Sequence, residues 1–277
     1  HIHIMGEVQL EVLTEWIRQR YGISVQFGEP EVLYRETIAG PVIGCGHFEP
    51  LRHYAEVHLR LSPAARGSGI TFSSECPTDA LSSHWQNLIQ THVMEREHRG
   101  VLTGMPLTDV QITLLSGQAH LKHTEGGDFR EATYRAVRQG LMQAESMVLE
   151  PYYRFEIEVE PSLTGRVFSD IQKRSGSCEA PVASGDEVRI TGRVPVAEMN
   201  GYMQELTAFS RGRGRMSLQF DGYDDCHNAA AVIRQKEYDP LRDVLHTADS
   251  VFCSHGAGFL VKWDEVPSYL HLPLETV

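Results

Sequence analysis

Turn, strand and helix signals are packed unusually closely into residues 194–223. The segment contains Pro195, the pair Asn200-Gly201 and the run Gly212-Arg213-Gly214, each of which favours a turn. Around the second of these signals, a helix of about three turns is expected over residues 198–209. So many local constraints in one short segment predict a small α+β module with a fixed topology.

The residues upstream complete this module. Residues 153–160 alternate apolar and charged side chains, as a half-buried strand does, and Leu163, Val167 and Ile171 share one helix face. Strands are expected at residues 153–160, 177–182, 187–194 and 216–220, with helices at residues 163–171 and 198–209. This β-α-β-β-α-β order is that of the ferredoxin-like fold.

Two further regions precede the module and a tail follows it. An apolar stripe over residues 7–21 predicts a helix, followed by a strand at residues 23–27 and a break at Gly28-Glu29-Pro30. The next region mixes strands and helices, with strands expected at residues 32–38, 54–61, 70–74 and 108–116 and helices at residues 81–93 and 128–147. Asp128 is the expected N-cap of the second of these helices. In the tail, a helix is expected over residues 228–237.

Composition and charge limit the class of protein. A length of 277 residues indicates two domains, or three small ones, and no apolar run approaches the roughly 20 residues needed to cross a bilayer. The five cysteines are scattered without a Cys-x-x-Cys pair, which favours reduced thiols and a cytoplasmic location. The net charge of −12 argues against non-specific binding of nucleic acid, although local basic patches remain compatible with RNA contact.

Motifs for catalysis and for metal binding are missing from the sequence. It contains no P-loop, no Gly-x-Ser-x-Gly elbow and no His-Glu-x-x-His pair. Two groups of histidines lie close in sequence but lack the spacing of a zinc site: His47, His53 and His58, and His84, His92 and His98. We therefore expect no catalytic residue and no metal ion in this chain. A stand-alone enzyme that uses the histidine groups is the alternative from a different functional class.

Residues 194–223 resemble the last domain of elongation factor G. That family shows the same Val-Pro-x-Ala-Glu-Met-x-Gly-Tyr run, followed by Leu206, Gly-Arg-Gly and Phe220-x-x-Tyr223. Pro151-Tyr152 also matches that domain, and Met5-Gly6-Glu7 resembles the end of domain III before domain IV. The resemblance covers roughly residues 1–226.

The resemblance implies a multidomain α+β protein in four parts. Residues 1–28 would be the C-terminal half of domain III, and residues 29–149 would be a domain IV with the fold of ribosomal protein S5 domain 2. Residues 150–226 would be a ferredoxin-like domain V, and residues 227–277 a tail packed on domain V. The chain would be a fragment of a translational GTPase, so GTP and Mg²⁺ would bind to a domain of the parent outside it, and no cofactor is expected here.

Three short motifs of domain IV look more like the tetracycline-resistance ribosomal protection proteins: Gly67-Ser68-Gly69, Thr108-Asp109 and Asp128-Phe129-Arg130. These factors insert an elongated, tRNA-like domain IV into the ribosomal A site and release the drug. The resemblance therefore implies a monomer that binds the ribosome through 16S rRNA, 23S rRNA and ribosomal proteins, with no membrane partner. The alternative is an elongation factor G paralogue that promotes translocation.

Two loops, at residues 63–69 and 119–127, would form the tip of this domain IV. Its expected RNA contacts are Arg66, Gly67, Ser68, Gly69, His120, Lys122, His123 and Thr124. Elongation factor G has Tyr-His-Asp-Val-Asp where this chain has Ala-His-Leu-Lys-His at residues 119–123, and protection proteins have Tyr-Tyr-Ser-Pro-Val. His120 thus matches the tip histidine of elongation factor G, and Lys122 is suited to contact phosphate. An ordinary polar hairpin loop is the alternative interpretation.

Three arginines at the start of the last expected strand form a second candidate RNA contact. Arg211, Arg213 and Arg215 alternate in sequence, so they are expected on one face of that strand. The resemblance implies that they contact rRNA from domain V. The alternative is a solvated charge cluster that protects an edge strand from aggregation.

Overall fold

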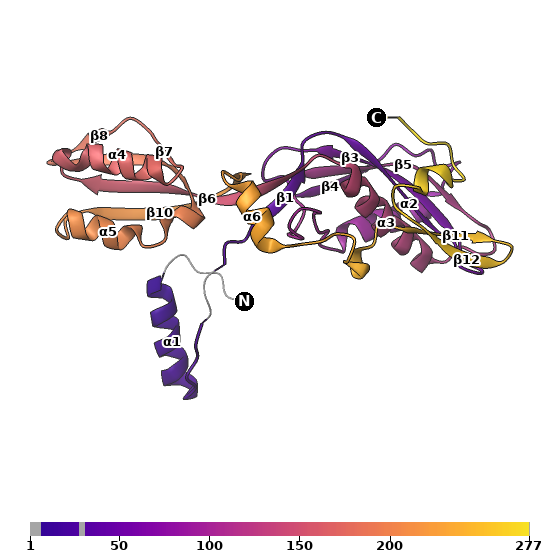
Figure 1. The fold of residues 1–277 in the computed structure, drawn as a ribbon, viewed down its shortest axis with the longest axis horizontal. Helices are drawn as coiled ribbons and strands as arrows, with labels where there is room; N and C mark the ends of the chain where they lie inside the picture. Colours follow the sequence, from indigo (N-terminus) through magenta and orange to yellow (C-terminus); the bar gives the residue numbers. More distant parts are fainter. Residues whose placement is uncertain (1–6, 28–30, 277) are drawn as a thin grey trace. The chain divides into compact units, whose positions relative to one another are not determined.

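The computed structural model describes residues 7–27 and 31–276, which divide into two compact units (Figure 1). One groups His1–Leu33 with Pro151–Asp221 and is called here the ferredoxin-like unit. The other groups Tyr34–Glu150 with Gly222–Val277 and is called the six-strand unit.

The first element is the predicted helix, α1 (Glu7–Tyr21), whose bounds agree with the apolar stripe. The strand expected at residues 23–27 is wrong, because these residues pair with no strand in the described part of the chain. A strand needs a partner for its backbone groups, and sequence alternation alone does not supply one. The break expected at Gly28-Glu29-Pro30 lies outside the described residues.

The ferredoxin-like unit has the predicted β-α-β-β-α-β order. Its elements are β6 (Ser146–Val159), α4 (Thr164–Lys173), β7 (Ser177–Cys178), β8 (Val182–Ser184), β9 (Glu187–Pro195), α5 (Tyr202–Phe209) and β10 (Arg215–Asp225), and residues 146–150 of β6 and 222–225 of β10 belong to the six-strand unit. The single strand expected at residues 177–182 is divided into β7 and β8. The strands pair in the order β10-β6-β9-β7, which confirms the ferredoxin-like topology. The helix expected from residue 198 begins only at Tyr202, because Gly201 has a left-handed φ of 74° and separates it from a 3₁₀ turn at Val196–Met199.

The six-strand unit is built on a sheet with the strand order β12-β11-β2-β3-β5-β4. Its strands are β2 (Val42–Phe48), β3 (Ala55–Pro63), β4 (Ile70–Ser74), β5 (Val110–Ala119), β11 (Ser250–Ser254) and β12 (Ala257–Val261). The prediction for β4 is confirmed residue for residue. The strand expected at residues 32–38 is shorter, β1 (Arg35–Ile38), and pairs with β6 instead of joining this sheet.

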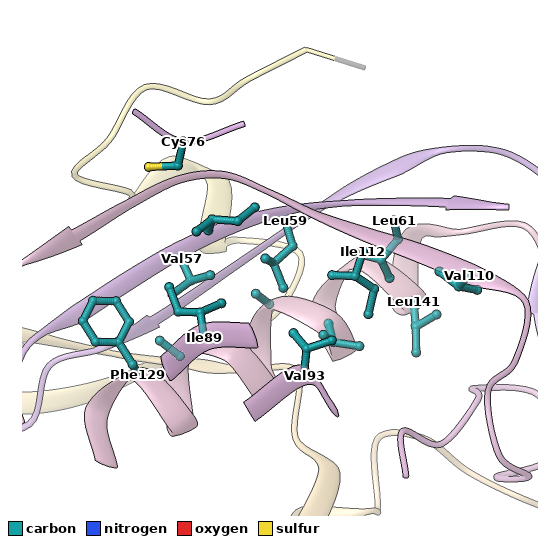
Figure 2. Close-up of a cluster of buried hydrophobic side chains, with 14 of the residues drawn as sticks. Val57, Leu59, Leu61, Cys76, Ile89, Val93, Val110, Ile112, Phe129 and Leu141 are labelled. Carbon is teal, nitrogen blue, oxygen red and sulfur yellow. The ribbon is translucent and has the colours of Figure 1, made fainter. Parts of the chain in front are cut away.

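Two helices, α2 (Ser83–Met94) and α3 (Gly126–Gln143), cover one face of the six-strand sheet. Figure 2 shows the core between them, where Val57 and Ile112 of the sheet meet Ile89 of α2 and Phe129 of α3. Asp128 was expected to be the N-cap of α3, but it is the third residue of the helix, so that prediction is wrong. Glu125 is the N-cap, and each of these two side chains accepts a hydrogen bond from the backbone N–H of the other.

The tail lies on the six-strand unit, so the prediction that it packs on domain V is wrong. Its helix α6 (Ala229–Lys236) was predicted, but β11 then pairs in parallel with β2, at Val251 and Phe48. Ile43 and Cys45 point away from α3 and form a second core with Phe252, Val261 and Val266 of the tail. The reason is physical: β2 would otherwise be a sheet edge with unpaired backbone groups and an uncovered apolar face.

No helix within the described ranges is both long enough and apolar enough to span a membrane. All five cysteines are free thiols, and Cys45 and Cys76 are buried. Burial raises the pKa of the Cys45 thiol to about 12.

Candidate functional site

The loop between β5 and α3, residues 120–125, is called here the His120 loop. Its backbone is fixed by the Thr124 hydroxyl, which accepts a hydrogen bond from the His120 N–H (2.6 Å) and donates one to the Tyr54 carbonyl oxygen (2.6 Å). The His120 Nδ1 accepts a bond from the Lys122 N–H at 3.2 Å. The His120 carbonyl oxygen also accepts bonds from the N–H groups of His123 and Thr124. The exposed side chains of this loop therefore project from an ordered turn.

Those side chains present flat rings, an apolar group and a positive charge. The rings of His120 and His123 stack with their centroids 4.4 Å apart and an angle of 16° between them. Leu121 is fully exposed, and Lys122, which lies between the two histidines in sequence, is exposed as well. Stacked rings beside a cation are the combination with which proteins hold unpaired bases and their phosphates.

A second turn, between β2 and β3, lies at the same end of the sheet. Phe48, Ala55 and Ala119 are aligned across β2, β3 and β5. The end of β2, the start of β3 and the end of β5 therefore lie at the same edge of the sheet. The turn exposes Leu51 and Arg52, and no residue in the described ranges pairs with the Arg52 guanidinium. Leu51 and Arg52 were not predicted as site residues, because β2 before them was not predicted from the sequence. Ile43, Cys45 and His47 alternate there with two glycines, which is only a weak strand signal.

The Asp128 carboxylate joins the two turns. One oxygen lies 2.8 Å from the Nδ1 of His53, and the other accepts bonds from the N–H groups of Tyr54 (3.4 Å) and Glu125 (2.8 Å). Because Asp128 is almost completely buried, these bonds are shielded from water. The start of α3 therefore fixes the positions of both exposed turns.

A third turn, between β11 and β12, also ends at this level. Glu49 accepts a bond from the Cys253 N–H at 3.3 Å, and Ser254 pairs with Ala257 across the turn. The turn residues His255 and Gly256 have φ angles of 51° and 78°. This end of the six-strand unit thus gains an exposed histidine from the tail, which the sequence did not indicate.

The loop at residues 64–69 lies at the other end of β5, so the prediction that the two loops form one tip is wrong. Pro63 pairs with Val110, whereas Ala55 pairs with Ala119, and the strand between them separates the loops by about 30 Å. Arg66 in this loop forms an ion pair with Asp225 (2.6 Å). The role of Arg66, Gly67, Ser68 and Gly69 in binding rRNA stays a prediction.

The three arginines before β10 do not share a strand face. Arg211 lies in a turn with a φ of 54°, and the strand begins only at Arg215. Arg213 pairs with Glu160, and Arg215 lies 3.1 Å from Glu187. The alternation argument fails because it needs extended backbone, which the two glycines on either side of Arg213 interrupt. Contact of these arginines with rRNA stays a prediction.

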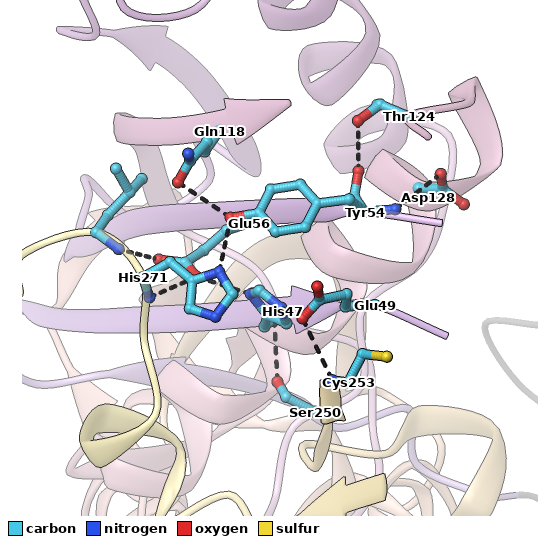
Figure 3. A network of polar contacts seen from close by, with 11 residues as sticks. His47, Glu49, Tyr54, Glu56, Gln118, Thr124, Asp128, Ser250, Cys253 and His271 are labelled. Atoms are coloured by element: carbon cyan, nitrogen blue, oxygen red, sulfur yellow. Dashed lines mark hydrogen bonds and ion pairs between the residues drawn. The ribbon is translucent and has the colours of Figure 1, made fainter. Parts of the chain in front are cut away.

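A buried polar network lies on the sheet face that the tail covers (Figure 3). Glu56 accepts hydrogen bonds from the backbone N–H groups of His271 (3.0 Å) and Leu272 (2.8 Å). Its other partners are the rings of His47 (2.7 Å) and His58 (3.1 Å). Burial alone would raise the pKa of Glu56, but these four hydrogen bonds outweigh it and hold the pKa below its usual range.

A cavity of about 280 Å³ lies between α3 and the tail. Its basic lining residues are Arg96, His98, Arg99, Arg135, Arg138 and His246. Several guanidinium groups already bond within the protein: Arg96 donates to the Leu245 carbonyl oxygen at 2.9 Å, and Arg138 donates to the Arg99 carbonyl oxygen at 2.8 Å and to the Tyr238 hydroxyl at 2.6 Å. These arginines therefore fasten the tail to the six-strand unit.

Comparison with protein families identifies both units. Residues 30–145 match the model of elongation factor G, domain IV, and residues 147–233 match that of the elongation factor G C-terminus. The chain carries domain IV and the C-terminal domain of the elongation factor G family. The resemblance read from the sequence is thereby confirmed. Residues 234–277, which contain β11 and β12, lie beyond both matches.

The relatives of this chain include both a tetracycline resistance protein and an elongation factor G. The chain is 30% identical over 257 residues to the tetracycline resistance protein TetP of Clostridium perfringens, which covers 91% of this chain and 39% of that protein. It is also 30% identical over 241 residues to elongation factor G of Aquifex pyrophilus, covering 85% of this chain and 34% of the relative. The chain therefore spans well under half the length of these relatives, and equal identity does not separate one from the other.

A solved structure agrees with this assignment of the fold. A crystal structure of a protein from Thermus thermophilus superimposes with a TM-score of 0.73 and 28% sequence identity, covering 84% of this chain and 36% of that one. The predicted α+β architecture, with an elongation factor G domain IV and a ferredoxin-like domain after it, is confirmed.

Proposed function

We propose that this chain is the ribosome-binding part of a translational GTPase of the tetracycline-resistance ribosomal protection type. The observation that carries the proposal is the His120 loop, an ordered turn with stacked imidazoles and an exposed lysine at one end of domain IV. In support, the match to TetP covers a larger share of this chain than the match to elongation factor G.

In this proposal the end of domain IV that carries the His120 loop enters the ribosomal A site. Lys122 and Arg52 contact phosphates of 16S rRNA, and the stacked rings of His120 and His123 lie against bases. The net charge of −12 is no obstacle to this contact. Salt screens charges that lie more than about 8–10 Å away, so the rRNA responds mainly to the cations next to it. The loop displaces the drug by occupying its neighbourhood, so this part of the protein does mechanical work.

The parent protein supplies the chemistry, with GTP and Mg²⁺ bound to a domain outside this chain. Domain V contacts 23S rRNA through Arg211, which has no ion-pair partner among the described residues. Arg213 and Arg215 contribute less to this contact, because each is already paired with a carboxylate. The factor acts as a monomer on rRNA and ribosomal proteins.

One observation favours the alternative, an elongation factor G paralogue that promotes translocation. His120 matches the tip histidine of that family, whereas no residue of the loop follows the protection-protein sequence. Both proposals use the same end of domain IV and differ only in whether a drug is released.

The two proposals are separated by expressing the complete protein in a tetracycline-sensitive strain. Protection predicts a raised minimum inhibitory concentration, which replacement of His120, Lys122 and His123 by alanine abolishes. Lys173→Ala is the matched control, because Lys173 is an exposed lysine on α4 of domain V. Resistance that survives the triple replacement would rule out the assignment of the His120 loop.

A wild-type protein that confers no resistance would favour the paralogue, which a translocation assay with the same variants then tests. The coding sequence upstream of residue 1 provides a separate check on the GTPase. A complete reading frame without a P-loop would contradict that part of the proposal.

A further inference from the structure

Three potential metal ligands from distant parts of the chain converge under the tail. His47 of β2 and Glu56 of β3 face each other directly in the antiparallel register. His271 of the tail completes the group, and one ligand atom of each residue lies within 4.8 Å of the others (Figure 3). We propose that these three residues bind a zinc ion that fastens the tail to the domain IV sheet.

The types of ligand favour a divalent transition-metal ion such as Zn²⁺. Two imidazoles and one carboxylate form a donor set that Zn²⁺ binds with three protein ligands and one further position. Mg²⁺ and Ca²⁺ prefer oxygen ligands throughout, so the two ring nitrogens disfavour them. His271 is exposed, whereas His47 and Glu56 are completely buried, so the ion reaches the site from the side of the tail.

Each proposed ligand is oriented by a second polar contact, as metal ligands in proteins usually are. The Nε2 of His47 lies 3.1 Å from a carboxylate oxygen of Glu49, and the Nδ1 of His271 lies 3.0 Å from the Tyr54 hydroxyl. The second oxygen of Glu56 lies 3.1 Å from the Nε2 of His58 and accepts a hydrogen bond from the Leu272 N–H at 2.8 Å. The His47 ring also stacks on Phe252 with centroids 4.1 Å apart, which fixes its plane.

The balance of charge favours a cation. Glu49 and Glu56 both point at His47, and neither pairs with a lysine or arginine within the described ranges. A buried carboxylate without a compensating charge is costly, and a divalent ion would supply two positive charges at once. On binding, the ion takes the place of the proton between the His47 Nδ1 and Glu56.

Two of the three ligands, His47 and Glu56, need to move little. Metal–ligand distances of about 2.0–2.2 Å in tetrahedral geometry place two ligand atoms about 3.3 Å apart. The His47 Nδ1 and the Glu56 oxygen are now 2.7 Å apart, so they would separate by about half an ångström. Two of the three ligands are on a rigid sheet, and the third is on the tail, so binding joins two segments more than 200 residues apart in sequence.

The test is zinc binding by the full chain after treatment with a chelator. Competition with a chromophoric zinc chelator should show one tightly bound Zn²⁺ per chain. His271→Ala, at an exposed position that leaves the sheet intact, should weaken binding by more than about tenfold, since even residues that only orient a ligand contribute tenfold to a hundredfold. His255→Ala is the matched control, an exposed tail histidine outside the ligand set, and should bind as the wild type does.

A second readout separates this site from weak binding to other exposed histidines. Zinc should raise the melting temperature of the wild type and of His255→Ala, but not that of His271→Ala. If the wild type binds no stoichiometric zinc, or if His271→Ala binds it as tightly as the wild type, the cluster is a hydrogen-bonded network only and the proposal is wrong.

Discussion

Replacement of Gly46 by alanine is expected to destabilise domain IV strongly, because α3 lies directly on the backbone of β2. A Cβ atom at this position would lie 2.0 Å from the Ala132 carbonyl oxygen and 2.5 Å from the Ala136 nitrogen. Both distances are far inside the roughly 3.5 Å at which nonbonded heavy atoms attract best. The obstacles are helix backbone, so no change of rotamer relieves the clash.

The size of the effect follows from these distances. α3 must move away from β2 by more than about 1 Å, which opens the core on the same side of the sheet. Overpacking costs about 1–3 kcal/mol when side chains adjust, and we expect at least about 3 kcal/mol where a helix must move. For a unit of this size, that corresponds to a fall in Tm of about 6–12 °C.

Differential scanning calorimetry of the full chain measures this change. Gly127→Ala is the matched control, since Gly127 lies in the first turn of α3 with nothing within 4 Å of a new Cβ. It should stabilise the unit slightly, because alanine is favoured over glycine in a helix by about 0.5–1 kcal/mol. A Gly46→Ala protein that melts within about 2 °C of the wild type would refute the close contact between α3 and β2.

Two further predictions concern the same unit. Burial lowers the pKa of His98 to about 4, so the unfolded chain takes up a proton near pH 6.5 that the folded chain resists. Stability should therefore fall by up to about 3 kcal/mol as the pH drops from about 6.5 to about 4. Urea melts of His98→Gln should show a flatter pH dependence, and an unchanged slope would contradict this. Asp128→Ala removes the acceptor for the Glu125 N–H and should cost about 1–2 kcal/mol in urea melts. His53→Ala, which removes only one partner of Asp128, should cost less, and equal costs would refute the capping role.

Elements with a strong local pattern were predictable from the sequence. The apolar stripe of α1 and the short strand β4 gave the observed bounds, and the ferredoxin-like topology followed from alternation and turn signals. For β4 and the ferredoxin-like unit the local preference and the tertiary environment agree, which is why a pattern of a few residues suffices.

β2 was not predictable, because its packing removes the usual signal. Gly44 and Gly46 replace the apolar side chains that would make the alternation visible, and they are required by the close approach of α3. A pair of glycines in sequence is more typical of a loop than of a strand. With β2 missed, the exposed turn at Leu51 and Arg52 was missed as well.

The candidate site was found in part for a related reason. The His120 loop follows a strand with a clear pattern, so a loop was predicted at this place, although β5 continues to Ala119 and α3 begins already at Gly126. Which other loop lies beside it depends on the register of β3 and β5, and that register places residues 64–69 at the far end of the sheet. Strand register is a tertiary property, set by pairing that no single strand encodes.

The position of the tail illustrates a more general limit of structure prediction from a single sequence. Glu56 of β3 holds the backbone N–H groups of His271 (3.0 Å) and Leu272 (2.8 Å) in the tail. Every residue except proline carries such a donor, so these contacts leave no mark on the tail sequence. The Glu56 carboxylate, by contrast, has no substitute, because a glutamine at this position would turn one acceptor into a donor facing donors. The information that places the tail therefore lies in the sheet, and variation in the tail should be tolerated at positions where variation at Glu56 is not.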